Sequence, residues 1–341
     1  MRTLEQLVRQ NIATMAPYST ARDEYQGDIG IYMDANENPY DNGVNRYPDP
    51  RQKALKERIA EIRGVSSENI FIGNGSDEAI DLVFRVFCDP RKDNVVAITP
   101  SYGMYSVAAA TNDVEMREVL LGENFELSSK AILETVDGNT KAVFLCSPNN
   151  PSGNLLDRAE IEKILGSFDG VVVIDEAYID FAECEGFVAR LPEYEKLIVL
   201  QTLSKAWAMA GLRVGLAFAD KRITDLFTRV KYPYNINVVT QKTVIDMLQQ
   251  EVTAQVHELV EQRKTVIDGL SKAPAVRHIY PSDANFILVK VNEPTVIYNK
   301  LINNGIIVRD RSRMVRCEGC LRITIGTPEQ NSKLIEIMQG L

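Results

Sequence analysis

Residues 171–178 read Val-Val-Val-Ile-Asp-Glu-Ala-Tyr, an unbroken apolar run that ends at two carboxylates and a tyrosine. Such a run predicts a strand buried on both faces, as in a parallel sheet covered by helices. In open sheets of this kind, ligands bind at the carboxyl ends of the strands. The stretch therefore predicts a central strand that carries Asp175 and Tyr178 to a binding site, although Asp175 could alternatively be only a helix cap.

The neighbouring sequence repeats this pattern on both sides. Amphipathic stretches such as 78–87 and 159–168 separate further short apolar runs. These runs lie at 70–72, 95–98, 142–145, 197–200 and 214–218. Repeated strand and helix units predict an α/β fold with a large, doubly wound, mostly parallel sheet domain over residues 36–240.

The last hundred residues have a different pattern. One long helical pattern, from about residue 240 to residue 271, precedes three strand candidates. These candidates are residues 285–291, 306–308 and 321–325. We expect a smaller α+β domain over residues 241–341.

The first residues of the chain show helical spacing of their apolar side chains, which are Leu4, Leu7, Val8 and Ile12. Pro17 follows them and ends the pattern. We expect residues 1–35 to form an arm whose helix packs on the small domain.

The composition excludes several classes of function. With 341 residues, the chain is long enough for about two domains. Its net charge of −9 argues against nucleic-acid binding, which needs a basic surface. No stretch approaches the roughly 18 apolar residues of a membrane helix, and the first residues lack the apolar core of a signal peptide. Five cysteines, an odd number, indicate reduced thiols and a cytoplasmic location.

A metal site is not expected. Cys317 and Cys320 form a CxxC, but this pair supplies only half the ligands of a structural zinc site. A turn between two strands explains it better, given Gly319 and the apolar flanks. The two histidines, His257 and His278, have no recognisable nucleophile or ligand context.

A second motif supplies an amine. Residues 202–207 read Thr-Leu-Ser-Lys-Ala-Trp, and Arg213 follows Lys205 by eight positions. A lone lysine is usually a solvated surface residue, but the surroundings of Lys205 are nearly uncharged. Such a pocket favours the neutral, nucleophilic amine. This arrangement could hold an aldehyde cofactor as a Schiff base, with the hydroxyls and Arg213 on its phosphate.

Residues 73–78, Gly-Asn-Gly-Ser-Asp-Glu, follow one strand and open a helix, which is the geometry of an anion site at a helix N-terminus. Alone, this pattern is more often a capped turn. Together with Ser204 and Arg213 it could complete a phosphate cradle. Asp175 would then keep the ring nitrogen of the cofactor protonated, which predicts pyridoxal phosphate as the cofactor.

Two more loops follow predicted strands at the same sheet edge. Residues 147–153 read Ser-Pro-Asn-Asn-Pro-Ser-Gly, which could be a pure turn or could aim an asparagine amide at the ring oxygen beside Tyr178. Residues 100–105 read Pro-Ser-Tyr-Gly-Met-Tyr, and Tyr102 could stack on the pyridine ring.

In their order and spacing, these motifs resemble the fold-type I aminotransferases and, more narrowly, the histidinol-phosphate aminotransferase family. Residues 45–50, Asn-Arg-Tyr-Pro-Asp-Pro, belong to the same series, and the resemblance runs from about residue 17 to residue 326. Met209 and Leu216 depart from residues common in the family, but both are apolar and lie away from the chemistry.

The resemblance implies a transaminase in which Lys205 binds pyridoxal phosphate covalently and then moves a proton as base and acid. It implies Asp175 at the ring nitrogen and Tyr102 stacked on the ring, with Tyr178 and Asn150 at the ring oxygen. Around the phosphate it places Ser76, Asp77, Thr202, Ser204 and Arg213.

The resemblance also implies partners. Tyr47 would reach the cofactor phosphate of the neighbouring subunit in a homodimer. Arg322 and Arg309 would bind the carboxylates of glutamate or 2-oxoglutarate and the phosphate of histidinol phosphate, with Tyr18 closing over the substrate. A surface ion pair with Asp310 or Glu318 is the simpler alternative for Arg309.

Related activities use the same cofactor motifs. An aromatic-amino-acid aminotransferase and a threonine-phosphate decarboxylase are the nearest alternatives, and motif spacing does not separate them. A regulator that uses this fold as a ligand sensor is disfavoured, because the acidic chain has no spare basic segment for DNA binding. A catalytically inactive homologue is disfavoured because every expected cofactor contact has a suitable side chain.

Overall fold

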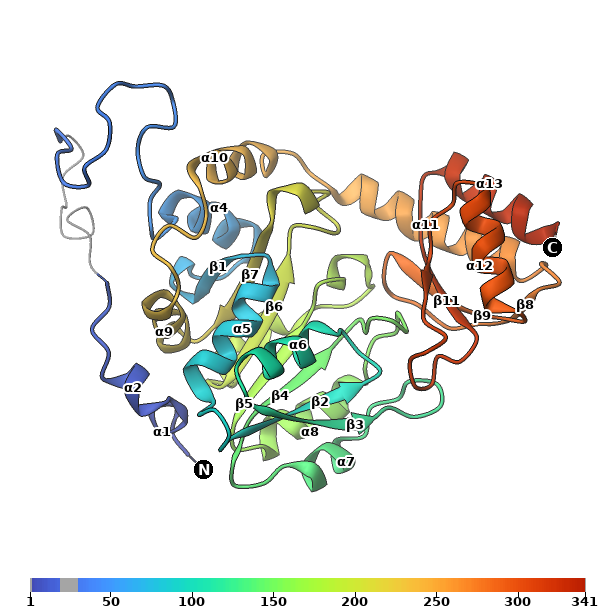
Figure 1. Cartoon of the computed structure of the whole chain (residues 1–341), viewed down its shortest axis with the longest axis horizontal. Helices are drawn as coiled ribbons and strands as arrows, with labels where there is room; N and C mark the ends of the chain where they lie inside the picture. The colour runs from blue at the N-terminus through green and yellow to red at the C-terminus, as the bar shows by residue number, and fades with distance from the viewer. Residues whose placement is uncertain (1, 19–29, 341) are drawn as a thin grey trace.

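The computed structural model describes residues 2–18 and 30–340. Figure 1 shows a large sheet wrapped by helices and, beyond the long helix α11, a smaller unit made from the last part of the chain. The two parts correspond to the large α/β domain and the smaller α+β domain that the sequence predicts.

The large sheet has seven strands in the order β1-β7-β6-β5-β4-β2-β3. All neighbours are parallel except β7, which runs antiparallel to both β1 and β6. The strands are β1 (Ile70–Asn74), β2 (Asn94–Thr99), β3 (Glu115–Leu120), β4 (Thr140–Cys146), β5 (Val171–Asp175), β6 (Leu197–Thr202) and β7 (Val214–Ala219).

Six of these strands coincide with the apolar runs of the sequence, and β3 does not. β5 is buried at every position because both faces of the sheet are covered. β3 lies at the edge of the sheet and is mostly exposed or half-buried, with charged Glu115, Arg117 and Glu118. Its pattern therefore lacks the continuous apolar run that identifies a central strand.

Helices cover both faces of the sheet. Successive strand residues alternate between two apolar clusters, as the two-residue period of a strand requires. One face packs on α4 (Lys53–Arg63), α7 (Ser129–Thr135), α8 (Arg158–Ser167) and α10 (Val238–Met247). The other packs on α5 (Ser76–Phe87), α6 (Met104–Thr111) and α9 (Lys221–Val230). Short 3₁₀ turns lie at η1 (Ser67–Asn69), η2 (Ile179–Phe181), η3 (Phe187–Glu193) and η4 (Ala210–Leu212).

The N-terminal helices pack on the large domain, so their expected packing on the small domain is wrong. The apolar residues form two short helices, α1 (Leu4–Leu7) and α2 (Gln10–Ala13). Leu4, Leu7 and Ile12 are buried in the apolar cluster under α5 and α9. The N–H of Arg9 donates to the Val86 carbonyl at 2.9 Å. Apolar spacing shows that a helix must bury one side, but it does not say against which domain. Residues 19–29 of the predicted arm lie outside the described residues.

The small domain has a four-stranded antiparallel sheet in the order β10-β11-β9-β8. Its strands are β8 (Val276–Ile279), β9 (Phe286–Val291), β10 (Arg309–Asp310) and β11 (Cys320–Thr324). The helices are α11 (Thr253–Leu270), α12 (Pro294–Asn303) and α13 (Pro328–Gln339). The strand expected at residues 306–308 is displaced to β10, and β8, which is half exposed, has no counterpart among the predicted strands.

The single helix expected over residues 240–271 is two helices, α10 and α11, with a break between them. α10 packs on the large domain: the amide of Gln241 donates to the Asp49 carbonyl at 3.1 Å, and Arg58 donates to the Leu248 carbonyl at 2.8 Å. We therefore propose that the small domain begins with α11 rather than at residue 241.

The cysteine pair lies at the end of the turn that connects the antiparallel strands β10 and β11, as expected, and Cys320 is the first residue of β11. The N–H of Cys320 donates to the Cys317 carbonyl at 2.9 Å, and both thiols are buried and free. Burial raises the pKa of Cys317 to about 12 and that of Cys320 to about 11, so both stay protonated. Across the described residues, no group of three or more side chains could hold a metal ion. Within the same part of the chain, no helix is long and apolar enough to span a membrane.

A second buried carboxyl, Glu176, follows Asp175 at the end of β5. Its oxygens accept hydrogen bonds from the N–H of Phe187 at 2.6 Å and from the amide of Gln201 at 3.0 Å. A Cβ atom at Gly186 would lie 2.6 Å from the same carboxyl, so the loop before η3 closes directly on it. Burial raises the pKa of Glu176 to about 7. Glu176 therefore fixes this loop to β5 and β6, and ionising it costs stability.

We expect the Glu176→Gln variant to be more stable than the wild type above about pH 7. A carboxyl with a raised folded pKa contributes stability that is complete below its ordinary pKa of 4.5 and is lost as the pH rises to about 7. The advantage of the variant should thus grow across this range to on the order of 1–3 kcal/mol. The amide of Gln201, whose oxygen is buried without a partner, can rotate to accept from the new amide.

Urea unfolding at a series of pH values measures this difference. The exposed Glu57→Gln variant is the matched control. A stability difference for Glu176→Gln that does not change between pH 4.5 and pH 7 would contradict the burial argument.

Candidate active site

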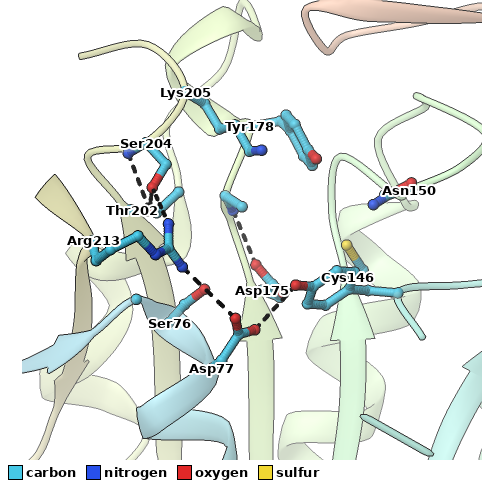
Figure 2. Close-up of a pocket in the computed structure, with 13 residues that line it drawn as sticks. Ser76, Asp77, Cys146, Asn150, Asp175, Tyr178, Thr202, Ser204, Lys205 and Arg213 are labelled. Carbon is cyan, nitrogen blue, oxygen red and sulfur yellow. Dashed lines mark hydrogen bonds and ion pairs between the residues drawn. The ribbon is translucent and has the colours of Figure 1, made fainter. Parts of the chain in front are cut away.

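A cavity of about 510 Å³, including its open mouth, lies at the carboxyl ends of the central strands. β4, β5 and β6 end at it, and α5 begins at it. Figure 2 shows the side chains converging on it from these elements. All the cofactor residues predicted within one chain line it: Ser76, Asp77, Tyr102, Asn150, Asp175, Tyr178, Thr202, Ser204, Lys205 and Arg213.

Asp175 is the buried acid of the cavity. It is 3% exposed, and its carboxylate accepts hydrogen bonds from the N–H of Ala177 at 3.1 Å and from the hydroxyl of Tyr105 at 2.8 Å. Burial raises the pKa of Asp175 to about 6, against the opposing effect of these two donors. The carboxylate is thus held rigidly and would be stabilised by a cationic partner in the cavity.

Tyr105 is a site residue that the sequence reasoning missed. It is fully buried on α6, and its hydroxyl makes the hydrogen bond that fixes one oxygen of Asp175. It follows Tyr102 by three residues in the motif at residues 100–105, so the sequence already showed two tyrosines at the spacing of about one helical turn. The motif alone does not say that its second tyrosine points back into the sheet.

Lys205 opens onto the cavity from the loop after β6. Its Nζ lies 5.6 Å from the centre of the Tyr178 ring. Partial burial and the positive charges of Arg322 and Arg213 lower the pKa of Lys205. Within the described part of the chain, no hydrogen bond or ion pair holds the amine. These conditions favour a nucleophilic amine that can bond to an aldehyde.

An anion cradle forms one end of the cavity. The N-terminus of α5, with Ser76 in its first turn, directs main-chain N–H groups toward it. Arg213 points to the same place, with Nη1 3.4 Å from the Ser204 hydroxyl and Nη2 3.9 Å from the Asp77 carboxylate. The Thr202 hydroxyl donates to Ser204 at 3.0 Å. The hydroxyls, the cation and the helix end together suit a phosphate group.

Two glycines permit the elements of the cradle to approach each other. Gly75 has φ +74, and a Cβ atom there would lie 2.7 Å from Nη2 of Arg213. A Cβ atom at Gly215 on β7 would lie 2.0 Å from the main-chain nitrogen of Ser76. Arg213 itself has φ +56, a conformation that is strained for arginine. The local backbone conformation therefore both leaves space for the Arg213 guanidinium and holds it at this position.

Aromatic and polar side chains line the opposite part of the cavity. The hydroxyl of Tyr102 donates to Asp77 at 3.0 Å, which places its ring at the cavity wall. Tyr178 packs edge-on against Phe286 of the small domain, with ring centres 5.0 Å apart. Burial raises the pKa of both tyrosines, so their hydroxyls remain donors at neutral pH. Asn150 is buried beside them, as Figure 2 shows.

The small domain brings arginines to the cavity mouth. Arg322 on β11 donates a hydrogen bond to the Oδ1 atom of Asn150, which leaves the NH₂ of that amide free to face the cavity. Arg309 on β10 pairs directly across from Arg322 in the sheet. The ion pair considered for Arg309 with Asp310 or Glu318 does not form in the described structure.

Two predicted residues lie apart from the cavity. Tyr18 is 71% exposed and lines a separate surface groove with Pro50 and Arg229. Tyr47 is 50% exposed and stacks on Tyr234, with ring centres 4.5 Å apart. The roles expected for Tyr18 and Tyr47 remain predictions.

The residues that are present fit pyridoxal phosphate. Gly75 leaves space in the cradle that an added Cβ atom would fill. The buried carboxylate of Asp175 lies at the base of the cavity, and the amine of Lys205, unpaired among the described residues, lies at its rim. Lys205 would hold the aldehyde group, Asp175 the ring nitrogen, and Arg213 with the N-terminus of α5 the phosphate. Such a site can activate bonds at a carbon that carries an amino group.

Comparison with known proteins gives a consistent result. A family model for aminotransferase class I and II matches residues 32–338. The histidinol-phosphate aminotransferase of Parabacteroides distasonis is 53% identical over 343 residues, covering 100% of this chain and 99% of the relative. The enzyme of the same name from Bacteroides thetaiotaomicron is 50% identical, covering 99% of both chains.

Solved structures share the fold. The histidinol-phosphate aminotransferase from Clostridium acetobutylicum has a TM-score of 0.80 at 24% identity, covering 87% of this chain and 90% of that one. The enzyme of the same name from Sinorhizobium meliloti, solved with pyridoxal-5'-phosphate, has a TM-score of 0.79 at 20% identity, covering 86% and 82%. At these identities the likeness concerns the fold.

We expect the Gly75→Ala variant to bind pyridoxal phosphate about tenfold more weakly or worse, because the new methyl group displaces Arg213 from the cradle. Gly64→Ala is the matched control, since Gly64 also has a positive φ, +66, but has nothing within 4 Å of the added Cβ. Titration of the apoprotein with pyridoxal phosphate, followed by absorbance, measures the affinity. Equal affinity in the two variants would show that the position of Arg213 does not matter.

Proposed function

Because the chain belongs to the class I and II aminotransferases, we propose that it transfers the amino group of L-histidinol phosphate to 2-oxoglutarate. The products are imidazole acetol phosphate and L-glutamate, and the reaction is a step of histidine biosynthesis. Relatives at about 50% identity over the full chain carry this activity in their names. The observation that carries the proposal is the convergence of Lys205, Asp175 and the anion cradle on one cavity, with Arg322 at its mouth.

Pyridoxal phosphate, when bound, supplies the electron sink that allows a proton to leave the carbon bearing the amino group. Lys205 is the residue placed to move that proton. Its lowered pKa keeps a fraction of the amine neutral, so Nζ can accept a proton and later return it to another carbon. Tyr178, close to the amine, contributes a donor hydroxyl and an aromatic wall that restricts the position of Nζ.

Asp175 stabilises positive charge at the base of the cavity. A buried carboxylate with fixed donors cannot turn away from its partner, and ionisation becomes more favourable when a cation neutralises it. Tyr105 and the N–H of Ala177 hold the two oxygens of this carboxylate. Asp175 therefore acts as the fixed counter-charge for the protonated ring nitrogen, with Tyr105 as its positioning residue.

Substrate anions bind at the domain boundary. Arg322 lies between the domains and contacts Asn150, so an anion bound there would contact groups from both. Guanidinium groups suit both the carboxylates of glutamate and a phosphate ester. Arg309, opposite Arg322 across the ladder, gives the site a second cation. Sharing these cations would let one pocket accept the two substrates in turn.

A homodimer completes the proposal. Much of the segment between residue 30 and α4 stands away from the body of the large domain, as Figure 1 shows, whereas Tyr47 stacks on Tyr234. Its side chains include Ile31 at 92%, Met33 at 89% and Tyr40 at 82% exposed, a degree of apolar exposure typical of an interaction surface. We propose that this segment contacts a second copy of the chain and that Tyr47 reaches the phosphate site of that copy. The free buried thiols are consistent with a reducing compartment such as the cytoplasm.

We expect L-histidinol phosphate, added without an acceptor, to bleach the absorption band of the Lys205-bound cofactor, and 2-oxoglutarate to restore it. Lys205→Ala should abolish turnover while binding of pyridoxal phosphate stays measurable, because the phosphate and ring contacts persist. Phenylalanine and threonine phosphate, tested in parallel, distinguish the related activities. No bleaching by histidinol phosphate, with bleaching by another donor, would refute the proposed substrate.

Mixed dimers test the role of Tyr47. Tyr47→Phe and Lys205→Ala should each impair the homodimer, whereas a dimer formed from one chain of each should regain activity. It contains one site with both native residues if Tyr47 acts across the interface. If Tyr47 acts within its own chain, no intact site forms and the activity of the mixture does not rise above that of the separate variants.

A further inference from the structure

The small sheet presents one face to its own helices and the other to the large domain. Leu321 and Ile323 of β11 lie in the apolar cluster with α11, α12 and α13. Cys320, which alternates with Leu321, lies in the cluster of the large domain. Because strand side chains alternate, Arg322 shares the face of Cys320, and its cross-strand neighbour Arg309 shares it too.

A third arginine continues this row. Arg311 follows Arg309 by two residues, and its N–H donates to the Cys320 carbonyl at 2.9 Å, so it extends the ladder of β10 and β11. With the two-residue period, its side chain leaves on the same face as Arg309. The electrostatic neighbours of its guanidinium include Arg322, Arg309 and the hydroxyl of Tyr178. Arg311 therefore lies near Arg322 and near Tyr178, which lines the cavity.

This group of cations is not neutralised within the described chain. Arg311 is partly buried, and its Nε atom is buried without a hydrogen-bond partner. No carboxylate forms an ion pair with Arg309, Arg311 or Arg322 among the described residues, whereas Arg63 is paired with Asp180 at 2.8 Å. Asp310, which lies between two of the arginines in sequence, is hydrogen-bonded to Ser312.

Close, unneutralised cations repel each other. Burial and the neighbouring arginines lower the pKa of Arg311, and burial together with Arg309 lowers that of Arg322. Holding the partly buried guanidinium groups of Arg311 and Arg322 beside the exposed Arg309 without a counter-charge costs stability. A bound anion would remove this cost, and an anion of charge two would remove more of it than an anion of charge one.

We propose that Arg311 is a specificity-determining residue that binds the phosphate group of the substrate and favours a phosphate monoester over a carboxylate. The inference rests on the proposed function and deepens it. A phosphate monoester carries about −1.5 to −2 charge and three acceptor oxygens, so it can use a third guanidinium. A carboxylate carries one charge and two oxygens, which one bidentate arginine already satisfies.

The test compares Arg311→Gln, Arg311→Lys and Arg313→Gln in the holoenzyme. Arg313 is exposed and two residues further along, so it is the matched control for loss of one positive charge. Half-reaction rates are measured with L-histidinol phosphate and with L-glutamate. Calorimetric titration of each holoenzyme with methyl phosphate, and separately with acetate, gives a binding readout that does not depend on turnover.

In Arg311→Gln we expect kcat/KM for histidinol phosphate to fall about tenfold to a hundredfold, because a charge-assisted hydrogen bond is lost. Glutamate should lose much less, methyl phosphate binding should weaken more than acetate binding, and Arg311→Lys should recover part of the loss. The ratio of wild-type to Arg311→Gln kcat/KM should shrink below about pH 6, where the substrate phosphate loses charge. Arg313→Gln should match the wild type.

Equal losses for histidinol phosphate and glutamate, or no loss for either, would overturn the proposal. Circular dichroism and thermal unfolding of both Arg311 variants separate a folding defect from a binding defect, and Arg311→Lys keeps the test valid if Arg311→Gln is unstable. If the wild type does not accept histidinol phosphate, the proposed function fails. The comparison of methyl phosphate with acetate still decides the role of Arg311.

Discussion

The buried carboxylate of Asp175 is the constraint on which the site depends. It can be placed at the end of β5 because helices cover both faces of the sheet and exclude water from the strand. Tyr105, from α6, and the N–H of Ala177 then hold both its oxygens. Burial raises the pKa of Asp175 to about 6, so a cationic partner in the cavity stabilises its charge. The fold thus holds a buried carboxylate whose negative charge a protonated ring nitrogen can neutralise.

Backbone geometry imposes a second constraint, at the anion cradle. Gly215 lets β7 approach the start of α5, and Gly75 leaves space for the guanidinium of Arg213. Arg213 adopts a positive φ, which is strained for arginine. Holding its side chain at the cradle therefore lowers the stability of the large domain. Helix N-terminus and guanidinium converge on the same point because each element is fixed by the packed core behind it. Binding of a phosphate group at the cradle would therefore be coupled to sheet packing in this domain.

In our proposal, the small domain adds selectivity rather than the core of the chemistry. Its sheet is covered by helices on one face and carries arginines on the other, where Arg322 contacts Asn150 of the large domain. Asn150 thereby contacts both domains, since its oxygen accepts a hydrogen bond from Arg322 while its NH₂ faces the cavity. The row of Arg309, Arg311 and Arg322 concentrates positive charge on the face of the small sheet where we propose that the substrate anions bind. The cavity and the arginines of the small domain are thus joined through one amide.

The sequence by itself determined the central strands, the motif residues of the cavity and the class of chemistry, because continuous apolar runs and loops at strand ends are local patterns. It did not determine β3, whose edge position leaves a polar sequence, or the packing of α1 and α2, because apolar spacing specifies a buried side but not its partner. Only the tertiary structure placed Tyr105 behind Asp175 and aligned Arg311 with Arg309 and Arg322. These contacts join residues from different elements, and which side chains meet there depends on how helix and strand, or two strands, are packed in space.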